Sequence, residues 1–362
     1  MRILTVVGAR PQFVKAAAVS RILRREHREI LVHTGQHYDH GLSQVFFDEL
    51  EMAPPDYNLK VGSGSHGHQT GQMLVRIEDV LLQERPDAVL VYGDTNSTLA
   101  AALAAAKLHI PVAHVEAGLR SFNPAMPEEI NRRLTDHLSQ ILFAPTAAAT
   151  AQLGREGIAA GVHQVGDVMY DILQANLERS RACSRLRAAL GLEAGRYVLA
   201  TIHRAENTDD PERLRAILEA FSAIDLPVLW PMHPRTRARI GQFGLEPLLA
   251  AAPQLRVVEP VGYLDMLALE AQARLILTDS GGVQKEAYLL AVPCLTVRGE
   301  TEWIETVSSG WNRLVAAEPA AIALAVTGCT RPAEHPAHYG DGNAARRIVE
   351  VLERHFAVAV PA

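Results

Sequence analysis

The sequence predicts an α/β protein made of two doubly wound, Rossmann-like domains with a ligand cleft between them. Short runs rich in Val, Ile and Leu alternate with helix-like segments, as expected for parallel sheets that helices cover on both faces. The alternation occurs in two successive series, and the 362 residues exceed the usual size of one compact core. We therefore expect ligands at the carboxyl ends of the strands, where doubly wound folds bind them.

The first series of elements belongs to an N-terminal domain that we assign to residues 1–166. Its strands are expected at Ile3–Val7, Glu29–His33, Ala88–Tyr92, Val112–Val115 and Ile141–Ala144. The helices expected between these strands are Lys15–Arg25, Gly71–Gln83, Ser97–Leu108 and Pro127–Leu138.

The second series belongs to a C-terminal domain that we assign to residues 167–342, with the break near Val165–Asp167. Its strands are expected at Tyr197–Ile202, Val228–Met232, Leu255–Val258, Leu275–Thr278 and Cys294–Val297. The helices include Asp210–Ala223, Tyr263–Ala271 and Gln284–Leu290. The remaining segment, 343–362, contains a last helix (Asn343–Phe356) that we expect to pack back on the N-terminal domain.

The bulk composition argues against several classes of protein. A net charge of −6 leaves no basic footprint for nucleic acid, so an anionic substrate needs local positive charge. The three cysteines are far apart without Cys-x-x-Cys spacing, which argues against disulfides and a zinc ribbon and fits the cytoplasm. No apolar run reaches the roughly 18 residues of a transmembrane helix, and the N-terminus lacks a signal-peptide pattern. We therefore expect no membrane insertion.

Two strand ends in the N-terminal half carry candidate ligand-binding residues. The first strand ends at Gly8, where the backbone can approach a ligand, and Arg10 and Lys15 would add positive charge for a diphosphate. Taken alone, a tight turn with two solvated cations explains this segment better. Asp94 follows the strand Ala88–Tyr92, where it is either a functional side chain or the N-cap of the next helix.

Acidic residues gather after the next predicted strand. Glu116 stands between a valine and an alanine at the strand end, where an idle carboxylate is costly, so we expect it to be functional or paired. Glu128 and Arg132 lie four residues apart in a helix that Pro127 opens. A surface ion pair explains those two residues alone, but it leaves Glu116 unexplained.

The strongest signal in the second half is the segment Leu277–Ala287. An apolar strand, a Ser280-Gly281-Gly282 turn and a helix present a hydroxyl and backbone N–H groups to a phosphate. Glu286 follows about one helical turn later, where it is placed to hold ribose hydroxyls. His203 also ends a strand and is a candidate general acid or phosphate donor, although a lone strand-end histidine is usually only hydrogen-bonded.

One glycine-rich segment matches a dinucleotide-binding pattern but lacks its context. Gly62–Gly67 fits Gly-x-Gly-x-x-Gly, yet the residues before it are polar and proline-rich, so we interpret it as a mobile loop near the cleft. His66 and His68, with His37, suggest a metal, but no Cys or carboxylate completes the set at a standard spacing. We expect no metal and no redox cofactor.

Taken together, these motifs resemble those of the non-hydrolysing UDP-N-acetylglucosamine 2-epimerases of bacterial surface-polysaccharide pathways. The resemblance covers nearly the whole chain and runs in one order through GARPQFVK, TGQHYD, VYGDTNSTLAAALAA, HVEAGLRS, PEEINRRLTDH, FAPT, TIHRAEN, HPRTR, TDSGGVQKEA and YGDGNAA. It implies the two-domain architecture of nucleotide-sugar glycosyltransferases, a UDP-sugar substrate and a homodimer.

The resemblance also implies roles for individual residues. The acid/base carboxylates are Asp94, Glu116 and Glu128, with His203 beside the diphosphate and sugar. The UDP-binding positions are Arg10, Lys15, Arg132, Ser280, Gly281, Gly282 and Glu286, to which we add Arg204, Glu302 and Trp303 as substrate contacts. His233 and Gln36 match positions linked in some members to a second, regulatory UDP-sugar site.

Three departures from the common family pattern bear on the substrate. Trp303 stands where many members have arginine, Lys285 replaces a common glutamate, and Asp39 stands where the regulatory site often has glutamine. The segments GARPQF, HRAENTD and ETEW resemble the branch that acts on UDP-2,3-diacetamido-2,3-dideoxyglucuronate. We expect Trp303 either to pack on an acetamido methyl, with Arg298 or Arg313 meeting a carboxylate, or to pack outside the site.

The chemistry of C2 favours elimination over direct proton abstraction. No carbonyl is conjugated to C2, so a carboxylate removes H2 while UDP leaves C1, and UDP then re-adds with protonation on the opposite face. This route needs two acid/base groups, retention of UDP and exclusion of water. Other open alternatives are a hydrolysing epimerase, a retaining UDP-sugar glycosyltransferase and a non-catalytic UDP-sugar sensor.

Overall fold

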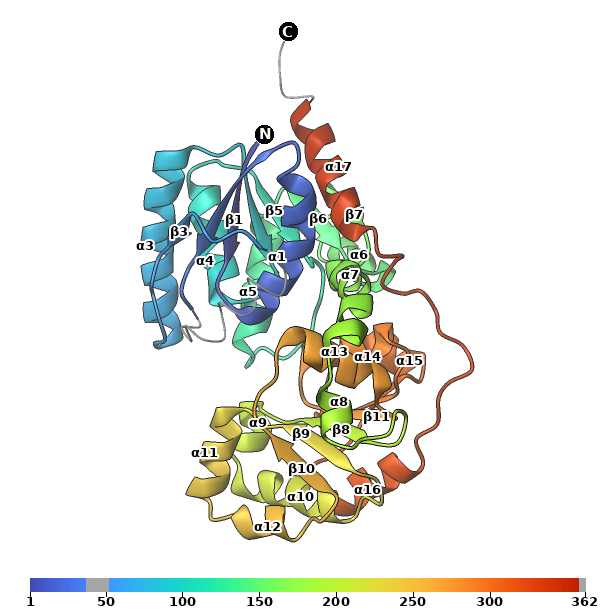
Figure 1. Cartoon of the computed structure of the whole chain (residues 1–362). Coiled ribbons are helices and arrows are strands. Elements are labelled where there is room, and N and C mark those ends of the chain that lie inside the picture. The colour runs from blue at the N-terminus through green and yellow to red at the C-terminus, as the bar shows by residue number, and fades with distance from the viewer. Residues whose placement is uncertain (37–51, 358–362) are drawn as a thin grey trace. The chain divides into compact units, whose positions relative to one another are not determined.

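The computed structural model describes residues 1–36 and 52–357 and divides into two compact units (Figure 1). Unit 1 comprises Met1–Gln174 together with Ala337–Ala362, and unit 2 comprises Ala175–Pro336. The chain passes from unit 1 to unit 2 within a single helix, α7 (Val168–Cys183). None of the helices in the described part of the chain is long and apolar enough to cross a membrane.

Unit 1 is built on a parallel sheet of seven strands within the described residues. The strands are β1 (Arg2–Val7), β2 (Arg28–His33), β3 (Tyr57–Asn58), β4 (Ala88–Tyr92), β5 (Val112–Val115), β6 (Ile141–Ala144) and β7 (Val162–Gln164). Their order is β3-β2-β1-β4-β5-β6-β7, so the direction of winding reverses between β1 and β4. Doubly wound sheets bind ligands at such a reversal, beyond the carboxyl ends of the strands.

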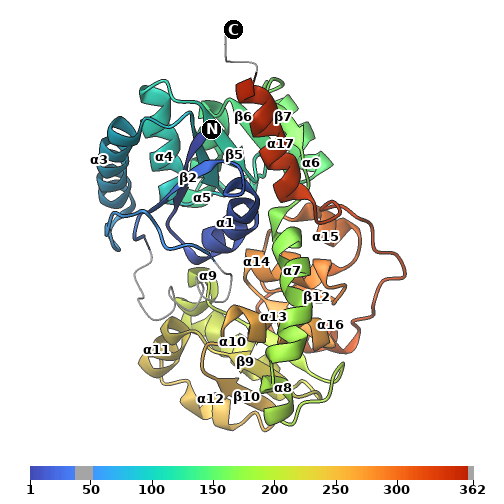
Figure 2. The same cartoon turned by 45° about the horizontal axis from the view of Figure 1, so that its top comes forward.

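Helices cover both faces of this sheet (Figures 1 and 2). They are α1 (Arg10–Leu23), α3 (His66–Glu84), α4 (Asn96–Lys107), α5 (Pro127–Leu138), α6 (Ala147–Arg155) and α17 (Ala344–Ala357). On one face α4 contacts both α3 and α5, and its buried alanines (Ala100, Ala101, Ala104 and Ala105) allow this close approach. Elsewhere α17 contacts α1, so the last helix completes the first unit.

Unit 2 repeats the same plan with six described strands in the order β10-β9-β8-β11-β12-β13. They are β8 (Val198–Thr201), β9 (Val228–Pro231), β10 (Leu255–Val258), β11 (Leu275–Thr278), β12 (Cys294–Thr296) and β13 (Asn312–Leu314). The helices are α8 (Leu186–Ala189), α9 (Ala205–Thr208), α10 (Pro211–Ser222), α11 (Pro234–Gln242), α12 (Glu246–Ala250), α13 (Tyr263–Gln272), α14 (Gly281–Leu289), α15 (Ile304–Ser308) and α16 (Pro319–Thr327). The core includes the edge-to-face pair of Phe221 and Trp230, whose ring centroids lie 5.3 Å apart.

The predicted α/β class with two doubly wound sheets is confirmed, and the differences are local. The sequence analysis missed β3, β7 and β13 because two or three residues carry too little periodicity to be recognised. The interpretation of Gly62–Gly67 as a loop was partly wrong, since β3 precedes it and α3 already begins at His66. However, β3 is a two-residue edge strand, whereas the dinucleotide pattern follows a central one.

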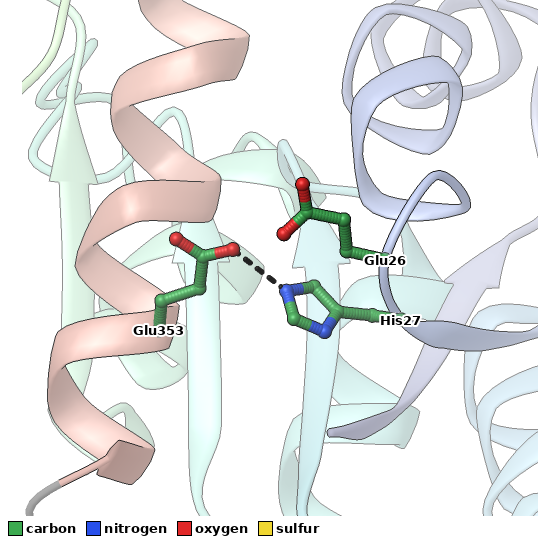
Figure 3. A group of neighbouring side chains, drawn as sticks. All are labelled: Glu26, His27 and Glu353. Atoms are coloured by element: carbon green, nitrogen blue, oxygen red, sulfur yellow. Dashed lines mark hydrogen bonds and ion pairs between the residues drawn. The ribbon is translucent and has the colours of Figure 1, made fainter.

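A small polar cluster links α17 to the end of α1 (Figure 3). His27 Nε2 lies 2.8 Å from Glu353 Oε1, and Glu26 lies beside them. Among the described residues, these three form the group whose ligand atoms are close enough to share a metal ion. The cluster lies past the carboxyl end of α1, at the edge of the sheet opposite the strand ends described below. Its clear role is to attach the last helix.

A buried histidine should make unit 1 sensitive to mild acid. Burial lowers the pKa of His33 from 6.5 to about 4, so between these two values the ring is neutral in the folded state and protonated in the unfolded state. Stability that is complete above pH 6.5 is therefore lost as the pH falls towards 4. Between pH 7 and 5 this group should cost on the order of 2 kcal/mol of unfolding free energy.

The measurement is urea denaturation at both pH values for the wild type and His33→Phe. The phenylalanine variant should lose less stability between pH 7 and 5, because the ionisable group is gone. His109→Asn is the matched control: His109 is exposed with a φ of 58°, which asparagine tolerates. Equal pH dependence in the wild type and His33→Phe would contradict this assignment.

Candidate functional site

Gln12 ties the first strand end of unit 1 to the end of β4. Its Oε1 accepts hydrogen bonds from the backbone N–H groups of Gly8, at 2.8 Å, and Ala9, at 3.1 Å. Its Nε2 donates to the carbonyl of Tyr92 at 2.7 Å. A Cβ at Gly8 would lie 2.0 Å from Ser97 Oγ, so only glycine fits there. The sequence analysis missed Gln12, although its place three residues after an N-cap position is a capping signal.

Glu116 has an unusual backbone and a close cationic partner. Its φ of 78° lies in the left-handed region that non-glycine residues rarely adopt, which indicates local strain at this candidate residue. Its carboxylate forms an ion pair with the ammonium group of Lys15 from α1. A Cβ on Gly93 would lie 3.3 Å from Glu116 Oε2 and 3.4 Å from Lys15 Nζ, so Gly93 leaves room for this pair.

Asp94 and Arg132 form the second ion pair of this site. Arg132 Nη2 lies 3.0 Å from Asp94 Oδ2, and the Arg132 side chain is 3% exposed. Its other terminal nitrogen, Nη1, is buried without a hydrogen-bond partner, so it is available to an anionic ligand. Asn131, from the same helix, donates to the carbonyl of Asp94 at 2.9 Å and so orients the turn after β4.

The structure brings the predicted carboxylates of unit 1 into one electrostatic group. Burial raises the pKa of the Asp94 carboxyl. Arg132 and Lys15 oppose this change, whereas the charges of Glu116 and Glu128 add to it. Three carboxylates and two cations thus influence one another at neighbouring strand and helix ends, an arrangement suited to proton transfer by the carboxylates.

A buried charge network lies beneath these turns and was missed from the sequence. Asp136 on α5 lies 2.7 Å from His114 and accepts from Arg120 at 2.7 Å. Arg120 in turn donates to both carboxylate oxygens of Glu156, at 2.8 and 2.7 Å. The hydrogen bonds from Arg120 lower the pKa of Glu156 to about 2. Only their proximity in space reveals this network, because its members come from four separate segments.

In unit 2, Asp279 organises the strand ends of β8 and β11. Its fully buried carboxylate accepts hydrogen bonds from the backbone N–H groups of His203, at 3.1 Å, and Arg204, at 3.0 Å. Asn207 Nδ2 donates to the same carboxylate at 3.1 Å. The imidazole of His203 lies 3.7 Å from it and is 42% exposed, so this candidate side chain can reach a ligand.

The predicted Ser280-Gly281-Gly282 turn begins α14 as expected. Ser280 is the N-cap of this helix, and Gly282 is exposed. A Cβ on Gly281 would lie 2.6 Å from Glu302 Oε1, so glycine is required for the close approach of that carboxylate. Glu302 also pairs with the buried Arg298, whose Nη1 lies 3.1 Å from its Oε2. The turn thus places the free N–H groups at the start of α14 beside the ion pair of Arg298 and Glu302.

Two departures from the family pattern contact each other in unit 2. The ammonium of Lys285 lies 4.2 Å from the centroid of the Trp303 ring, in cation–π geometry, and both residues are buried. The indole nitrogen would lie 3.5 Å from a Cβ on Gly281, which places the ring beside the turn. Trp303 is therefore a packing partner of Lys285 at the edge of the candidate site.

The remaining candidates have defined positions with two exceptions. Glu286 is buried in α14, Glu128 is half-buried in the first turn of α5, and His233 caps α11 with its ring centroid 6.1 Å from that of His203. Gln36 accepts from Ser97 Oγ at 2.7 Å. The exceptions are the Arg10 side chain and the segment with His37 and Asp39, which lie outside the described part of the structure.

Comparisons with known proteins identify the relatives of this chain. Residues 21–353 match the family described as UDP-N-acetylglucosamine 2-epimerase. A UDP-N-acetylglucosamine 2-epimerase homolog of Methanococcus maripaludis is 53% identical, over 97% of this chain and 99% of the relative. The UDP-2,3-diacetamido-2,3-dideoxy-D-glucuronate 2-epimerase of Pseudomonas aeruginosa is 50% identical, over 98% and 100%. A crystal structure of Methanocaldococcus jannaschii UDP-GlcNAc 2-epimerase, in complex with UDP-GlcNAc and UDP, superposes with a TM-score of 0.91 at 45% identity, over 98% of this chain and 100% of that one.

The Asp279 contacts should have a measurable effect on the stability of unit 2. In Asp279→Asn, the new amide NH₂ group faces the N–H donors of the β8–α9 turn instead of accepting from them. Buried N–H groups of that turn are then left without an acceptor. The unfolding free energy should fall by about 1–3 kcal/mol. Asp265→Asn is the matched control, since half-buried Asp265 accepts from one hydroxyl, that of Ser184. Equal stability of Asp279→Asn and the wild type in urea denaturation would contradict this role.

Proposed function

The chain belongs to the UDP-N-acetylglucosamine 2-epimerase family, and from this premise we propose that it inverts C2 of a UDP-linked 2-acetamido sugar and retains UDP in the product. It is an isomerase of the kind that its relatives' names describe. The observation that carries the proposal is the group of Asp94, Glu116 and Glu128 with Lys15 and Arg132 at the strand ends of unit 1.

The proposed reaction proceeds by elimination and re-addition of UDP. A carboxylate takes the proton from C2, the C–H electrons form the C1–C2 double bond, and UDP leaves with the C1–O electrons. The intermediate is a 2-acetamidoglycal. UDP then adds back to C1 while a second group delivers a proton to the opposite face of C2. Both carbons return to their original oxidation state, so no net oxidant is consumed.

The two ion pairs suggest which carboxylate carries the proton at the start. The ammonium of Lys15 contacts Glu116 and favours its ionised form, so we assign Glu116 as the base in one direction. Burial raises the pKa of Asp94, which favours its protonated form and the role of acid. Glu128, in the same electrostatic group, is the third candidate proton carrier.

We assign recognition of UDP to the strand ends of unit 2. Ser280 and the N–H groups that begin α14 are suited to a diphosphate oxygen, and His203 and Arg204 lie on the neighbouring β8–α9 turn. Glu286 is assigned to the ribose hydroxyls. In unit 1, Nη1 of Arg132 is buried without a hydrogen-bond partner and is suited to an anionic group.

The proposed substrate is the diacetamido-glucuronate form of the UDP-sugar, with UDP-N-acetylglucosamine as the second candidate. The relative at 50% identity is named for the first sugar, and one at 45% identity is named for the second. Lys285 and Trp303 lie together beside the Gly281 turn and give this region a charge distribution unlike the arginine of many members.

We further propose that the enzyme is a homodimer that works in the cytoplasm. Helices of unit 1 expose apolar side chains that a second copy could cover: Val75 and Leu82 on α3 are 57% and 56% exposed, and Ile130 and Leu134 on α5 are 49% and 47% exposed. Multi-angle light scattering of the wild type tests the dimer, and a monomeric mass at micromolar concentration would reject it.

The proton chemistry is tested by turnover in D₂O. The wild type should give the C2 epimer with deuterium at C2, because a proton held by a carboxylate exchanges with solvent. Asp94→Asn, Glu116→Gln and Glu128→Gln should each lower kcat by about a hundredfold or more. UDP affinity should hardly change in these variants.

Ser280→Ala is the control for nucleotide binding, because here UDP affinity itself should fall. Calorimetry should show binding weaker by about 1.5–3 kcal/mol. NMR analysis of the products separates the alternatives. Free sugar and UDP would indicate a hydrolysing enzyme, and no reaction without an acceptor would indicate a transferase or sensor. Near-normal turnover in all three carboxylate variants would reject the mechanism.

Substrate choice is tested by kcat/KM for the two UDP-sugars. Trp303→Arg alone places a guanidinium beside the buried ammonium of Lys285, so it should lower stability. The informative variant is therefore Lys285→Glu with Trp303→Arg, which replaces the cation–π contact by an ion pair. It should shift preference towards UDP-N-acetylglucosamine by about tenfold, the effect of about 1.4 kcal/mol. An unchanged ratio in the double variant would place specificity elsewhere.

A further inference from the structure

A buried histidine–aspartate pair joins the two turns that carry the proposed acid and base. His114 lies on β5 and is fully buried, and Asp136 on α5 is 1% exposed. Neither has a role in the reaction described above. Their side chains nevertheless contact the backbone on both sides of the proposed chemistry.

The imidazole of His114 connects this pair to the turn after β4. The Nε2 of His114 lies 2.8 Å from the carbonyl oxygen of Gly93, the residue before Asp94. The N–H of Gly93 donates to the carbonyl of Val115 at 3.0 Å, so both polar groups of this glycine are engaged. The direction in which the chain enters Asp94 is therefore set by β5 and its histidine.

The second connection is to the turn after β5. Asp136 Oδ2 accepts the backbone N–H of Gly118 at 3.1 Å, two residues beyond the strained Glu116. Gly118 itself has a φ of 85°, and a Cβ there would lie 2.4 Å from the carbonyl oxygen of Ala149. This turn therefore has little freedom to relax, and Asp136 holds the end that follows Glu116.

The hydrogen-bond geometry fixes which ring nitrogen of His114 donates to Gly93. The carbonyl oxygen of Gly93 can only accept, so Nε2 of His114 donates to it. Asp136 Oδ2 accepts from both Gly118 and Arg120, as a carboxylate does, and its Oδ1 lies 2.7 Å from Nδ1 of His114. Nε2 of His114 therefore carries a proton, and a second proton lies between Nδ1 and the Asp136 carboxyl group.

We propose that His114 and Asp136 are positioning residues for the proposed epimerisation, and that this hydrogen-bonded pair fixes the turn before Asp94 relative to the turn after Glu116. This inference rests on the proposed function for what is being positioned. At the outer end of the network Glu156 pairs with Arg120, which also pairs with Asp136, and the described hydrogen bonds of Glu156 reach neither the Gly93 nor the Gly118 backbone. Glu156 therefore provides a matched control.

The test compares Asp136→Asn and His114→Gln with the control Glu156→Gln. In Asp136→Asn the amide nitrogen can only donate, so the contact with either Gly118 or His114 is lost. In His114→Gln the single amide cannot replace the contacts of both ring nitrogens, with Gly93 and with Asp136. Either change therefore releases one turn. The kcat and the rate of deuterium incorporation at C2 should fall together by about tenfold to a hundredfold, the cost of misplacing a reacting group by about 1 Å. KM and the Kd for UDP should stay within about twofold, as expected when only transition-state geometry is lost.

Glu156→Gln should lose stability but keep kcat per UDP-binding site within about twofold of the wild type, because it leaves both turns attached. A kcat loss that follows the loss of melting temperature across all three variants would mean a structural role only and would overturn the proposal. So would wild-type turnover in Asp136→Asn.

Proton-detected ¹⁵N NMR of the wild type decides the same question if the variants do not fold. Nε2 of one slowly exchanging histidine should carry a proton at about pH 8, because it donates to the carbonyl of Gly93. A buried His114 whose Nε2 carries no proton would overturn the proposal. Failure of the proposed function looks different: the wild type would form no C2 epimer and incorporate no deuterium, while the NMR result would still stand.

Discussion

The ion pair between Lys15 and Glu116 is the contact on which the arrangement of unit 1 depends. It joins the first helix to the end of a strand more than one hundred positions later in sequence, and it does so at a residue with a left-handed backbone. An unpaired carboxylate in such a buried position would be costly. The pair therefore explains how the strained turn persists, why a glycine faces it at position 93, and why the neighbouring Asp94 lies in a field of opposing charges.

Both units use a buried carboxylate to fix the turns that follow their strands. In each unit the turns after two neighbouring strands must be held in place: those after β8 and β11, at the winding reversal, in unit 2, and those after β4 and β5 in unit 1. In unit 2, Asp279 does this directly by accepting backbone N–H groups from the β8–α9 turn. In unit 1, Asp136 accepts one backbone N–H group and reaches the second turn through His114. A buried carboxylate suits this task because it can accept several hydrogen bonds at once, and charge strengthens each of them.

The sequence allowed much of the fold to be predicted, for reasons that particular segments show. Strands such as Ala88–Tyr92 are continuous apolar runs, and their bounds agreed with the structure residue for residue. Position relative to a strand end also pointed to Asp94 and Glu116, which the structure brings into one charged group. The supporting contacts were not predictable in this way. His114 and Asp136 act on residues distant in sequence, and nothing in their local pattern separates them from ordinary polar residues. The capping position of Gln12 gives a local signal, but its contact with Tyr92 does not follow from that signal.

The contact between α1 and α17 has a consequence for synthesis on the ribosome. Unit 1 is discontinuous in sequence: its sheet is translated first, unit 2 follows, and only then does Ala344–Ala357 emerge. Until that moment the surface of α1 that α17 contacts is uncovered, and Ile348 and Leu352 of α17, which are buried in the finished unit, have not yet been made. The nascent chain must therefore carry an unfinished apolar face on its first unit while the whole of the second is being made.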